Sequence, residues 1–541
     1  MTNRTRVDFL LLAGFCAFLF FYGISKFGLI GADEPRYAQV AREMLERADW
    51  ITPTLGGRPW LEKPPLYYWE AMMSYRIFGV SDWSARLPSA FDATLLVLAL
   101  YFFLRKFFPR VALDGALILA SCAGIVGYAR AASTDMPLAA TFSIALLCWW
   151  TWRETGNKLL LLLFFFFIAL GMLAKGPVGP FLAGSVLLLY AAANREFRRL
   201  SETLWPPGMV LFCVIALPWY FLVQARNPGF FREFIVEQNL GRFSENLYHH
   251  VEPFWYYVPV TLVAVVPWTV FVIAGFVNAV RNWKKHRPSS SPGENRARDL
   301  GLFACCWLIV LVVFFSISQS KLPGYILPAI PAGALLLAIY LQKRVHEPQA
   351  GNPARLLIIF HALLAAAPLV PALLIAYLVM RNGLPVGRPL IVAVTIAAIL
   401  CAAMALTLLR RDGLRFLRFI TLIPVVLTVA AVLKFGSTAI DRTLSARPLA
   451  RELADLETQP MPLAVYHVPR ELEYGLTFYR NQLVINYAWG RIPADAHLLV
   501  APEDSQIEVA KLVPGRHVSF LGEYSPQKLD YFWISRAEPA H

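Results

Sequence analysis

Long apolar runs follow one another along most of this chain, with short charged connections between them. Thirteen runs have the length of a membrane-spanning helix, and they cover residues 8–30, 88–105, 112–128, 137–152, 159–174, 177–193, 207–223, 257–280, 301–318, 323–342, 356–380, 389–409 and 416–435. The hydrocarbon core of a bilayer is roughly 30 Å thick, which a helix of about 20 apolar residues can cross. A helix also satisfies its own backbone hydrogen bonds in lipid. The pattern therefore predicts a polytopic α-helical membrane protein with about thirteen transmembrane helices.

The apolar runs stop after residue 435, where a different pattern begins. Short β-like runs ("LAVYHV", "QLVINY" and "HLLVAP") alternate with a helical stretch around "ELEYGLTFYRN", which is typical of a small α/β domain. We therefore expect a transmembrane domain over residues 1–435 and an α/β domain over residues 436–541.

Two of the connections, 31–84 and 223–256, are long. In the first, apolar residues at 37, 40, 41, 44 and 45 recur at helical spacing, which predicts an amphipathic helix at the membrane surface. The aromatic stretch 66–78 predicts a second surface helix. The segment "RPSSSPGENRAR" (287–298) has the composition of a flexible linker.

Composition and charge narrow the class of protein. With 57% hydrophobic and 16% charged residues over 541 positions, the chain is too apolar for a soluble globular protein. The net charge of +14 lies largely in every second short connection, so it indicates orientation signals and contacts with anionic lipids rather than nucleic-acid binding. This asymmetry predicts an N-terminus in the cytoplasm and residues 436–541 outside the inner membrane.

Little in the sequence favours a metal or a disulfide. All seven cysteines lie inside apolar runs without metal-ligand spacing, which indicates buried thiols. His249 and His250 together with Glu62 could bind a divalent metal, but one adjacent histidine pair is a weak signal. We assign no metal and no cofactor.

Ionisable and tyrosine side chains gather at the outward ends of the predicted spans. They come from five separate connections: Asp33, Glu34, Arg36, Glu62 and Lys63; Asp135 in "RAASTDMP"; Lys175 in "AKGPVGP"; Glu237, Arg242, His249 and His250; and Lys321 and Tyr325 in "SKLPGY". Because each group lies at the same end of a span, we expect them to line one outward cavity near the membrane surface.

The residue types in this set suit group transfer from a phosphate. Asp33 and Asp135 could orient an acceptor or act as a general base. Lys63, Arg242 and Lys321 could stabilise the charge on a phosphate leaving group. Structural alternatives remain open: the carboxylates could cap helices, and the lysines could extend toward the membrane surface or lie at helix C-termini.

The block "DEPRYAQVAREML", with "DW" and "EKPPLYYW" after it, resembles the first outward loop of bacterial membrane glycosyltransferases related to the protein O-mannosyltransferases. Among these it is similar to the undecaprenyl-phosphate-aminoarabinose transferases of lipid A. "TDMP", "AKG", "RF…H…PFWYYVPV" and "SKLPGYILP" match further positions in the same order, over most of residues 10–345. The resemblance implies a membrane fold of the GT-C type and a sugar donor carried on undecaprenyl phosphate.

The resemblance also implies roles for individual residues. Asp33 is expected to be the catalytic acid or base, with Asp135 beside it, and Lys63 is expected to bind the donor phosphate. Donor binding is assigned to the remaining candidates as well: Arg36, Tyr37, Glu62, Arg242, His250, Lys321 and Tyr325. Two departures, "EKPPLYYW" for "EKPIAGYW" and His250 for arginine, leave the donor sugar and the acceptor open.

We therefore expect a glycosyltransferase that moves a sugar, 4-amino-4-deoxy-L-arabinose by the resemblance, from undecaprenyl phosphate to lipid A or a related envelope acceptor on the periplasmic face. The alternatives are an enzyme like the protein O-mannosyltransferases, another glycolipid glycosyltransferase, or a flippase for lipid-linked sugars. Transporters place ionisable groups near the bilayer midplane. Here the charges crowd one rim of the spans, which favours the enzyme.

Overall fold

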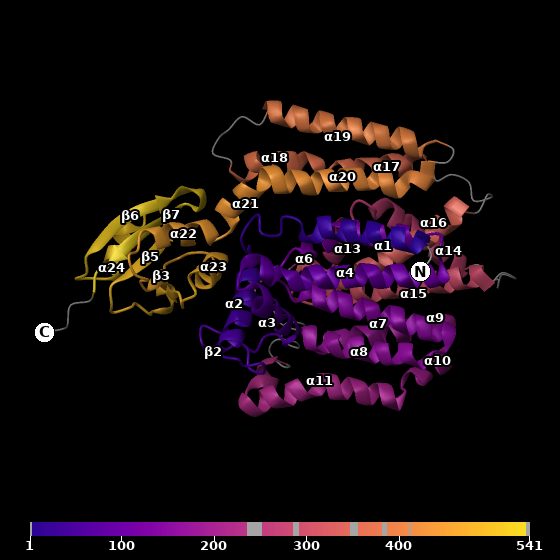
Figure 1. Ribbon diagram of the computed structural model, residues 1–541, viewed down its shortest axis with the longest axis horizontal. Coiled ribbons are helices and arrows are strands. Elements are labelled where there is room, and N and C mark those ends of the chain that lie inside the picture. The colour runs from indigo at the N-terminus through magenta and orange to yellow at the C-terminus, as the bar shows by residue number, and fades with distance from the viewer. Residues whose placement is uncertain are drawn as a thin grey trace.

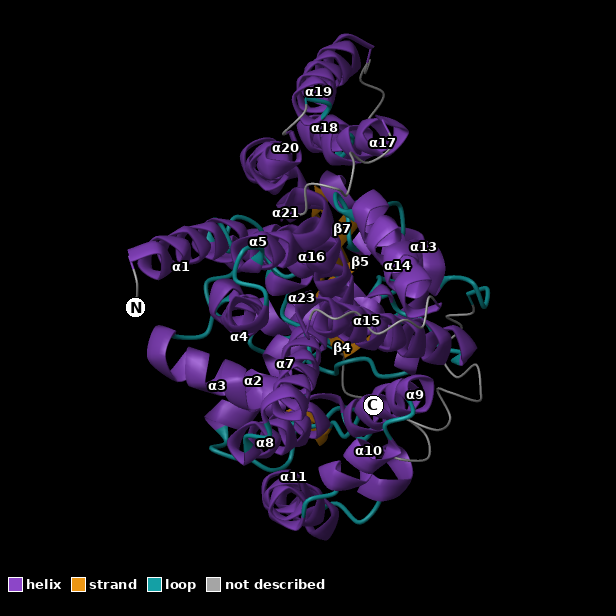
Figure 2. Cartoon of the chain, turned by 90° about the vertical axis from the view of Figure 1, so that its right-hand side faces the viewer, coloured by secondary structure: helices purple, strands orange, loops and turns teal. Residues whose placement is uncertain are grey.

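The computed structural model describes residues 3–234, 252–284, 292–346, 355–380, 387–410 and 413–536. Long helices run side by side, and a smaller region that contains a β-sheet lies at one end of them (Figure 1). Helices α17 to α20, between residues 355 and 431, form a group of their own beside the rest of the bundle, which is also visible when the helices are viewed end on (Figure 2). The chain is therefore a helical bundle with a mixed region attached.

Each of the thirteen predicted spans contains helix, although in the first, 8–30, the helix ends at Phe21. Within the described ranges, eight helical segments are long and apolar enough to cross a membrane, or ten if two bent pairs are counted. The bundle helices are α1 (Asn3–Cys16), α4 (Asp82–Phe107), α7 (Asp135–Thr155), α8 (Lys158–Lys175), α9 (Val178–Asn194), α11 (Pro206–Arg226), α15 (Pro292–Ile317), α16 (Ile330–His346), α17 (Arg355–Ala366), α18 (Leu369–Val379), α19 (Gly387–Leu408) and α20 (Leu417–Ala431). The multi-pass membrane fold is confirmed, and the count of thirteen crossings stays a prediction.

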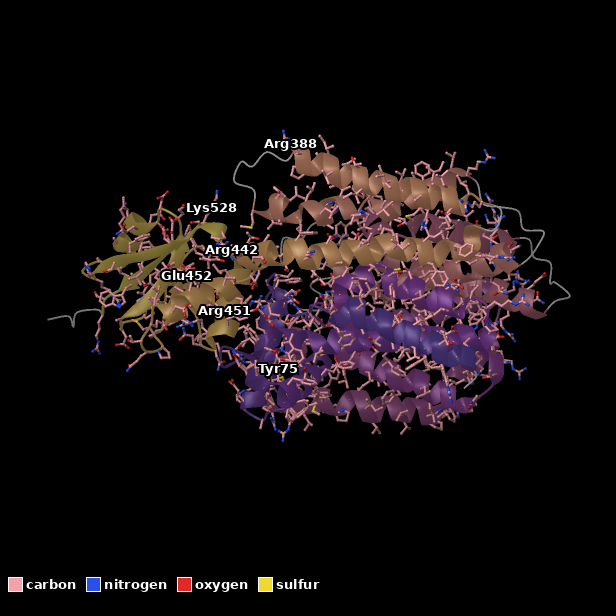
Figure 3. All side chains as sticks on the ribbon, turned by 45° about the horizontal axis from the view of Figure 1, so that its top comes forward. Tyr75, Arg388, Arg442, Arg451, Glu452 and Lys528 are labelled. Carbon is pink, nitrogen blue, oxygen red and sulfur yellow. The ribbon has the colours of Figure 1, made fainter. Side chains whose placement is uncertain are left out.

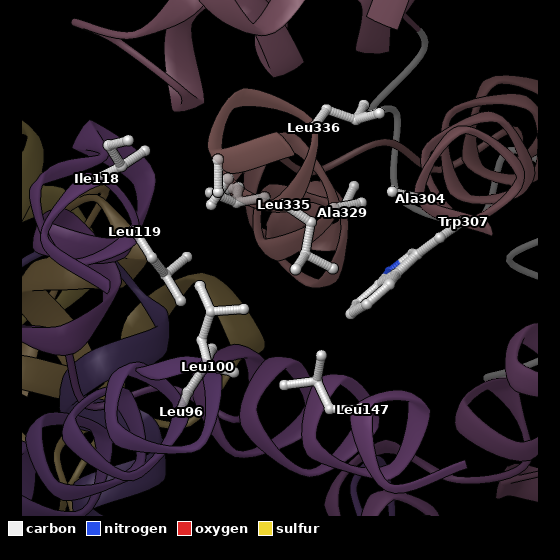
Figure 4. Close-up of a cluster of buried hydrophobic side chains, with 14 of the residues drawn as sticks. Leu96, Leu100, Ile118, Leu119, Leu147, Ala304, Trp307, Ala329, Leu335 and Leu336 are labelled. Atoms are coloured by element: carbon white, nitrogen blue, oxygen red, sulfur yellow. The ribbon is translucent and has the colours of Figure 1, made fainter. Parts of the chain in front are cut away.

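Large apolar side chains fill the interior of the bundle. Leu96 and Leu100 of α4 and Leu335 of α16 belong to one buried cluster (Figure 4). Trp307 of α15 is also fully buried there, and its indole N–H donates to the Pro328 carbonyl at 2.8 Å. Lipid tails are as apolar as leucine, so close packing of this kind, rather than removal from water, holds spanning helices together.

Two predicted spans are sharply bent. Residues 112–128 form α5 (Ala112–Ser121) and α6 (Ala123–Ala129), which are bent by 63°, and residues 257–280 form α13 (Tyr257–Ala264) and α14 (Thr269–Lys284), bent by 113°. The Ala123 N–H donates to the Val266 carbonyl at 2.8 Å, and the Trp268 indole donates to the Ser121 hydroxyl at 2.9 Å. Lipid offers no hydrogen bonds to an interrupted backbone. Groups at the two breaks instead bond to each other.

The linker predicted at 287–298 is wrong in its second half. Helix α15 begins at Pro292, so "PGENRAR" is helical. Proline is favoured in the first turn of a helix, and a carboxylate such as Glu294 suits the positive N-terminal end. The serine- and glycine-containing composition suggested a linker, although this proline and glutamate are typical of a helix N-terminus.

Both predicted surface helices are present, as α2 (Asp33–Glu46) and α3 (Leu66–Phe78), with the short strands β1 (Thr54–Leu55) and β2 (Arg58–Pro59) between them. The rings of Tyr37, Tyr67 and Tyr68 pack between the two helices with centroids 6.0–6.2 Å apart. This aromatic contact fixes α2 against α3. Another short helix, α10 (Phe197–Thr203), connects α9 and α11.

The C-terminal region holds a five-stranded sheet in the order β4-β3-β5-β7-β6, with parallel pairing at β3 and antiparallel pairing at β7. Its elements are α21 (Ser437–Leu444), α22 (Arg447–Asp455), β3 (Leu463–Val465), α23 (Arg470–Arg480), β4 (Ile485–Asn486), β5 (His497–Pro502), α24 (Gln506–Leu512), β6 (Val518–Tyr524) and β7 (Leu529–Ile534). The three predicted strands and the predicted helix are confirmed. The domain boundary at 435 stays a prediction. Helical structure continues past this position to Leu444.

The C-terminal region is bonded to the segment that follows α1. The Gly28 N–H donates to Asp441 at 2.7 Å, and the Leu29 N–H donates to the Tyr479 hydroxyl at 2.7 Å. Arg447 pairs with Asp441 at 2.8 Å and with Asp82 of α4 at 2.7 Å. Charged side chains cover this end of the molecule, as Arg442, Arg451, Glu452 and Lys528 illustrate (Figure 3). These bonds fix the C-terminal region over one end of the bundle.

Candidate active site

A cavity of about 1230 Å³ lies where the helix ends meet the C-terminal region. It is bordered by the start of α2, the α6–α7 connection, the end of α8, α20 and α23. Its ionisable lining residues include six acidic and six basic ones: Asp33, Glu34, Glu62, Asp135, Glu471 and Glu473, and Arg36, Lys63, Arg86, Arg130, Lys175 and Arg470. Charges of both signs therefore converge in one space.

Asp33 is the first residue of α2 and pairs with Arg36 one turn later. The Asp33 side chain is 50% exposed, whereas that of Arg36 is 14% exposed. The Arg36 guanidinium also lies 5.1 Å from the ring centroids of both Tyr37 and Trp60. Burial alone would lower the pKa of Arg36, but Tyr37, Asp33 and Glu62 outweigh it, so its pKa is raised. Arg36 is a permanent cation, and Asp33 remains accessible beside it.

Lys63 reaches the cavity from a non-helical stretch that precedes α3. A proline disfavours helical conformation in the residue before it, and Pro64 and Pro65 come directly before the start of α3 at Leu66. Lys63 is only 9% exposed and lines the cavity. A lysine charge in such a position is largely withdrawn from bulk water, so it interacts strongly with charges near it.

Asp135 and Lys175 form an ion pair between the start of α7 and the end of α8. The Ser133 hydroxyl donates to the second Asp135 oxygen at 2.9 Å. The Lys175 ammonium also lies 4.3 Å from the ring centroid of Tyr325. A side chain on Gly324 would come within 2.7 Å of the Asp135 carboxylate, so "SKLPGY" needs glycine at this position to approach the cavity.

Glu34 and Arg86 form a buried ion pair behind Asp33, with Arg86 only 1% exposed. The Arg86 Nε donates to Glu34 at 2.9 Å and Nη2 at 2.6 Å. Glu34 also accepts the N–H groups of Ile30 and Ala132, at 2.8 Å and 2.7 Å. Glu34 therefore joins three segments of the cavity wall, and no side-chain cap is formed at the start of α2.

The structure brings most of the predicted site residues together. Asp33, Arg36, Tyr37, Glu62, Lys63, Asp135 and Tyr325 all line the cavity. Lys321 does not line it, because its ammonium donates to the Ser318 carbonyl in its own turn at 2.6 Å. The direct phosphate contact predicted for Lys321 therefore has no support in this geometry. Arg242 and His250 lie outside the described residues.

The described part of the chain offers no cluster of three or more His, Cys, Asp or Glu side chains that could hold a metal ion. The pair His249 and His250, considered as metal ligands together with Glu62, lies outside that part. The described geometry therefore gives no reason to assign a metal.

Sequence reasoning missed two contributions to the cavity. Arg86 stands just before the apolar run of α4, and a lone arginine at the start of a span was a signal that could have been used. Residues of the C-terminal region (Arg470, Glu471, Glu473, Tyr474 and Trp489) also line the cavity. No local signal in the sequence connects them with residues more than 400 positions earlier.

The cavity can bind a phosphate and position an acceptor beside it. Lys63 and Arg36 are cations with low exposure, which is the arrangement that stabilises charge developing on a leaving group. Val429 of α20 and the two residues Val432 and Leu433 just after it add an apolar strip to the same cavity. A charged headgroup and part of a lipid chain can therefore be held in one place.

Comparison with known proteins agrees with this geometry. Residues 62–221 match the family described as dolichyl-phosphate-mannose-protein mannosyltransferase. An undecaprenyl phosphate-alpha-4-amino-4-deoxy-L-arabinose arabinosyl transferase of Pseudomonas fluorescens is 30% identical over 397 residues, which are 72% of this chain and 68% of that protein. A transferase of the same name from Pseudomonas paraeruginosa is 30% identical over 391 residues, covering 70% of this chain and 67% of that protein.

The fold is shared with a solved structure. The crystal structure of ArnT from Cupriavidus metallidurans bound to undecaprenyl phosphate superposes with a TM-score of 0.76 at 24% identity, covering 98% of this chain and 99% of that one. The same protein in the apo state gives the same TM-score at 23% identity. The match extends over the helical bundle and the C-terminal region alike. The chain thus belongs to the undecaprenyl phosphate-4-amino-4-deoxy-L-arabinose arabinosyl transferases, a family of membrane glycosyltransferases.

Proposed function

We propose that this enzyme transfers 4-amino-4-deoxy-L-arabinose from undecaprenyl phosphate to a phosphate of lipid A, or to a related envelope glycolipid, on the periplasmic face of the inner membrane. The observation that carries the proposal is the cavity that joins Lys63 and the Asp33–Arg36 pair to the apolar strip at the end of α20. The names of the relatives supply the donor. The basic residues of alternate connections support a cytoplasmic N-terminus and an outward cavity.

In the proposed reaction the acceptor oxygen forms a bond to the anomeric carbon of the donor sugar. The bond from that carbon to the phosphate oxygen breaks, and its electron pair leaves with undecaprenyl phosphate. Lys63 and Arg36 stabilise the charge on the departing phosphate, because charged donors in a site with little water interact strongly with it. Neither residue has to change its protonation state.

The acceptor decides what Asp33 does. A hydroxyl acceptor must lose a proton, which the exposed Asp33 carboxylate can take. A phosphate acceptor is already an anion at neutral pH, and Asp33 then serves to hold Arg36 in place. Asp135 is bound to Lys175 and Ser133, so we assign it to positioning rather than to proton transfer.

The test is a transfer assay with purified enzyme in proteoliposomes and undecaprenyl phosphate bearing radiolabelled aminoarabinose. Lipid A, the same lipid without phosphates, and a serine- and threonine-rich peptide are offered as separate acceptors. We expect label in lipid A only. Label in the peptide would favour the activity of the protein mannosyltransferases, whose family matches residues 62–221. Donor that crosses the membrane without any transfer would favour the flippase.

A further inference from the structure

The C-terminal region supplies one wall of the catalytic cavity. Five of its side chains line that space: Arg470, Glu471, Glu473 and Tyr474 from the first turns of α23, and Trp489 from the 3₁₀ turn Tyr487–Trp489. Helix α23 lies between the sheet and α2 (Figure 1). This wall therefore faces the segment that carries Asp33.

Trp489 is a large apolar side chain that stays 71% exposed although it lines the cavity. Its turn is fixed by Asn486, whose side chain accepts from the Ala488 N–H at 2.9 Å and donates to Glu473 at 2.8 Å. Gly490 ends the turn with a φ of 69°, which suits glycine. The ring is thus held open to the cavity, although burial would stabilise it.

Arg470 and Tyr474 lie one helical turn apart, so they share a face of α23. The Tyr474 ring centroid lies 5.7 Å from the Arg36 guanidinium, which places this face against the site. Among the described residues, Arg470 is exposed and forms no ion pair. By contrast, Arg36, Arg86 and Lys175 in the same cavity each pair with a carboxylate.

We propose that Arg470 and Trp489 form a subsite for the acceptor headgroup, which is an anionic saccharide of a lipid. A sugar ring lies against the Trp489 face, and a phosphate on that saccharide pairs with Arg470. This inference rests on the proposed function, because it names residues that select the acceptor of that reaction. Both side chains act on binding, and neither exchanges a proton or forms a bond to the sugar.

Glu471 offers a test of whether the bound headgroup is negatively charged. It is exposed, lines the same wall and lies next to Arg470, so its carboxylate repels an anionic headgroup. Removing the Arg470 charge should weaken acceptor binding, and removing the Glu471 charge should strengthen it. A purely structural role for this turn predicts no such opposition.

The experiment measures KM for lipid A, KM for the donor and kcat at saturating lipid A in proteoliposomes. We expect Arg470→Ala to raise the acceptor KM roughly two- to fivefold, as for an exposed ion pair, and Trp489→Ala about three- to tenfold. Glu471→Gln should lower it up to about twofold. The donor KM and kcat should stay within twofold. Arg491→Ala and Phe520→Ala, exposed residues outside the cavity, are the matched controls.

An unchanged acceptor KM in both Arg470→Ala and Trp489→Ala would overturn the subsite while leaving the transfer reaction intact. A shift in the donor KM in place of the acceptor KM would overturn it as well. If the wild-type enzyme transfers to no lipid, the proposed function fails on its own. Direct binding of lipid A to the wild type and the two variants then still decides the subsite, since equal affinities contradict it.

Discussion

Lys63 is expected to be the most sensitive cation of the cavity. Replacing a preorganised donor that faces a leaving group costs about 10²–10³-fold in rate, so Lys63→Ala should lose transfer by that factor while the protein still elutes normally in detergent. Lys321→Ala is the matched control, because the Lys321 ammonium is bound within its own turn. We expect it to leave donor affinity within twofold. Near-normal turnover of Lys63→Ala would contradict the assignment.

Asp33→Asn separates the two classes of acceptor. With a hydroxyl acceptor the loss of a general base should lower kcat roughly 10²–10⁴-fold. With a phosphate acceptor the main loss should be in substrate binding, because Arg36 loses its charged partner. Steady-state kinetics with lipid A distinguish the two results. A folded Asp33→Asn enzyme with full activity would rule out both roles.

Glu34→Gln tests the buried pair behind the site. The change leaves the Arg86 charge buried opposite a neutral side chain, and breaking a buried pair in this way costs about 3–5 kcal/mol. We expect a clear fall in the midpoint of thermal unfolding. Glu46→Gln, at the exposed end of the same helix, should change stability by less than about 0.5 kcal/mol. Equal midpoints for the two variants would show that the pair is dispensable.

For single residues, the sequence was informative where neighbouring residues fix the position of a side chain. Pro64 and Pro65 keep Lys63 outside the helix that starts at Leu66, and Gly324 permits the close approach to Asp135. The Glu34–Arg86 pair was not found, because its partners lie 52 positions apart on different helices. Periodicity and motifs describe one segment at a time, whereas that pair depends on how two segments pack.

Prediction of the helices and strands was limited in the same way, because it also considers one segment at a time. Hydropathy located the spans, but it has the same value whether a run is straight or broken, so the bend between α5 and α6 was not expected. At that bend the Ala123 N–H donates to the Val266 carbonyl of another span, a contact that no property of one segment predicts. In the C-terminal region, β6 alternates poorly between buried and exposed positions, which explains why no strand was predicted there.

The paired breaks can be tested through their side-chain bond. Ser121→Ala leaves the buried Trp268 indole without its acceptor, and an unsatisfied buried donor costs about 1–3 kcal/mol. We expect a lower thermal midpoint in detergent. Ser185→Ala is the control, because that hydroxyl bonds only within its own helix and should matter little. A Ser121→Ala protein as stable as the control would mean that the breaks hold without this bond.

For the whole molecule, the charge asymmetry predicts the orientation in the membrane. A reporter that is active only outside the cytoplasm should work when fused at residue 541 and be silent at residue 290. Activity at 290, or silence at 541, would contradict the outward cavity. A cytoplasmic reporter at both positions provides the complementary control.

The bond between Leu29 and Tyr479 joins groups that are 450 positions apart, and this separation has a consequence in time. Ribosomes add about 5–20 residues per second, so roughly 20–90 seconds pass between the synthesis of the two partners. During that interval Asp33 and Lys63 are already made, but the α23 wall does not yet exist. A stalled or prematurely terminated chain would therefore carry the loop with Asp33 and Lys63 but lack the cavity wall that α23 provides.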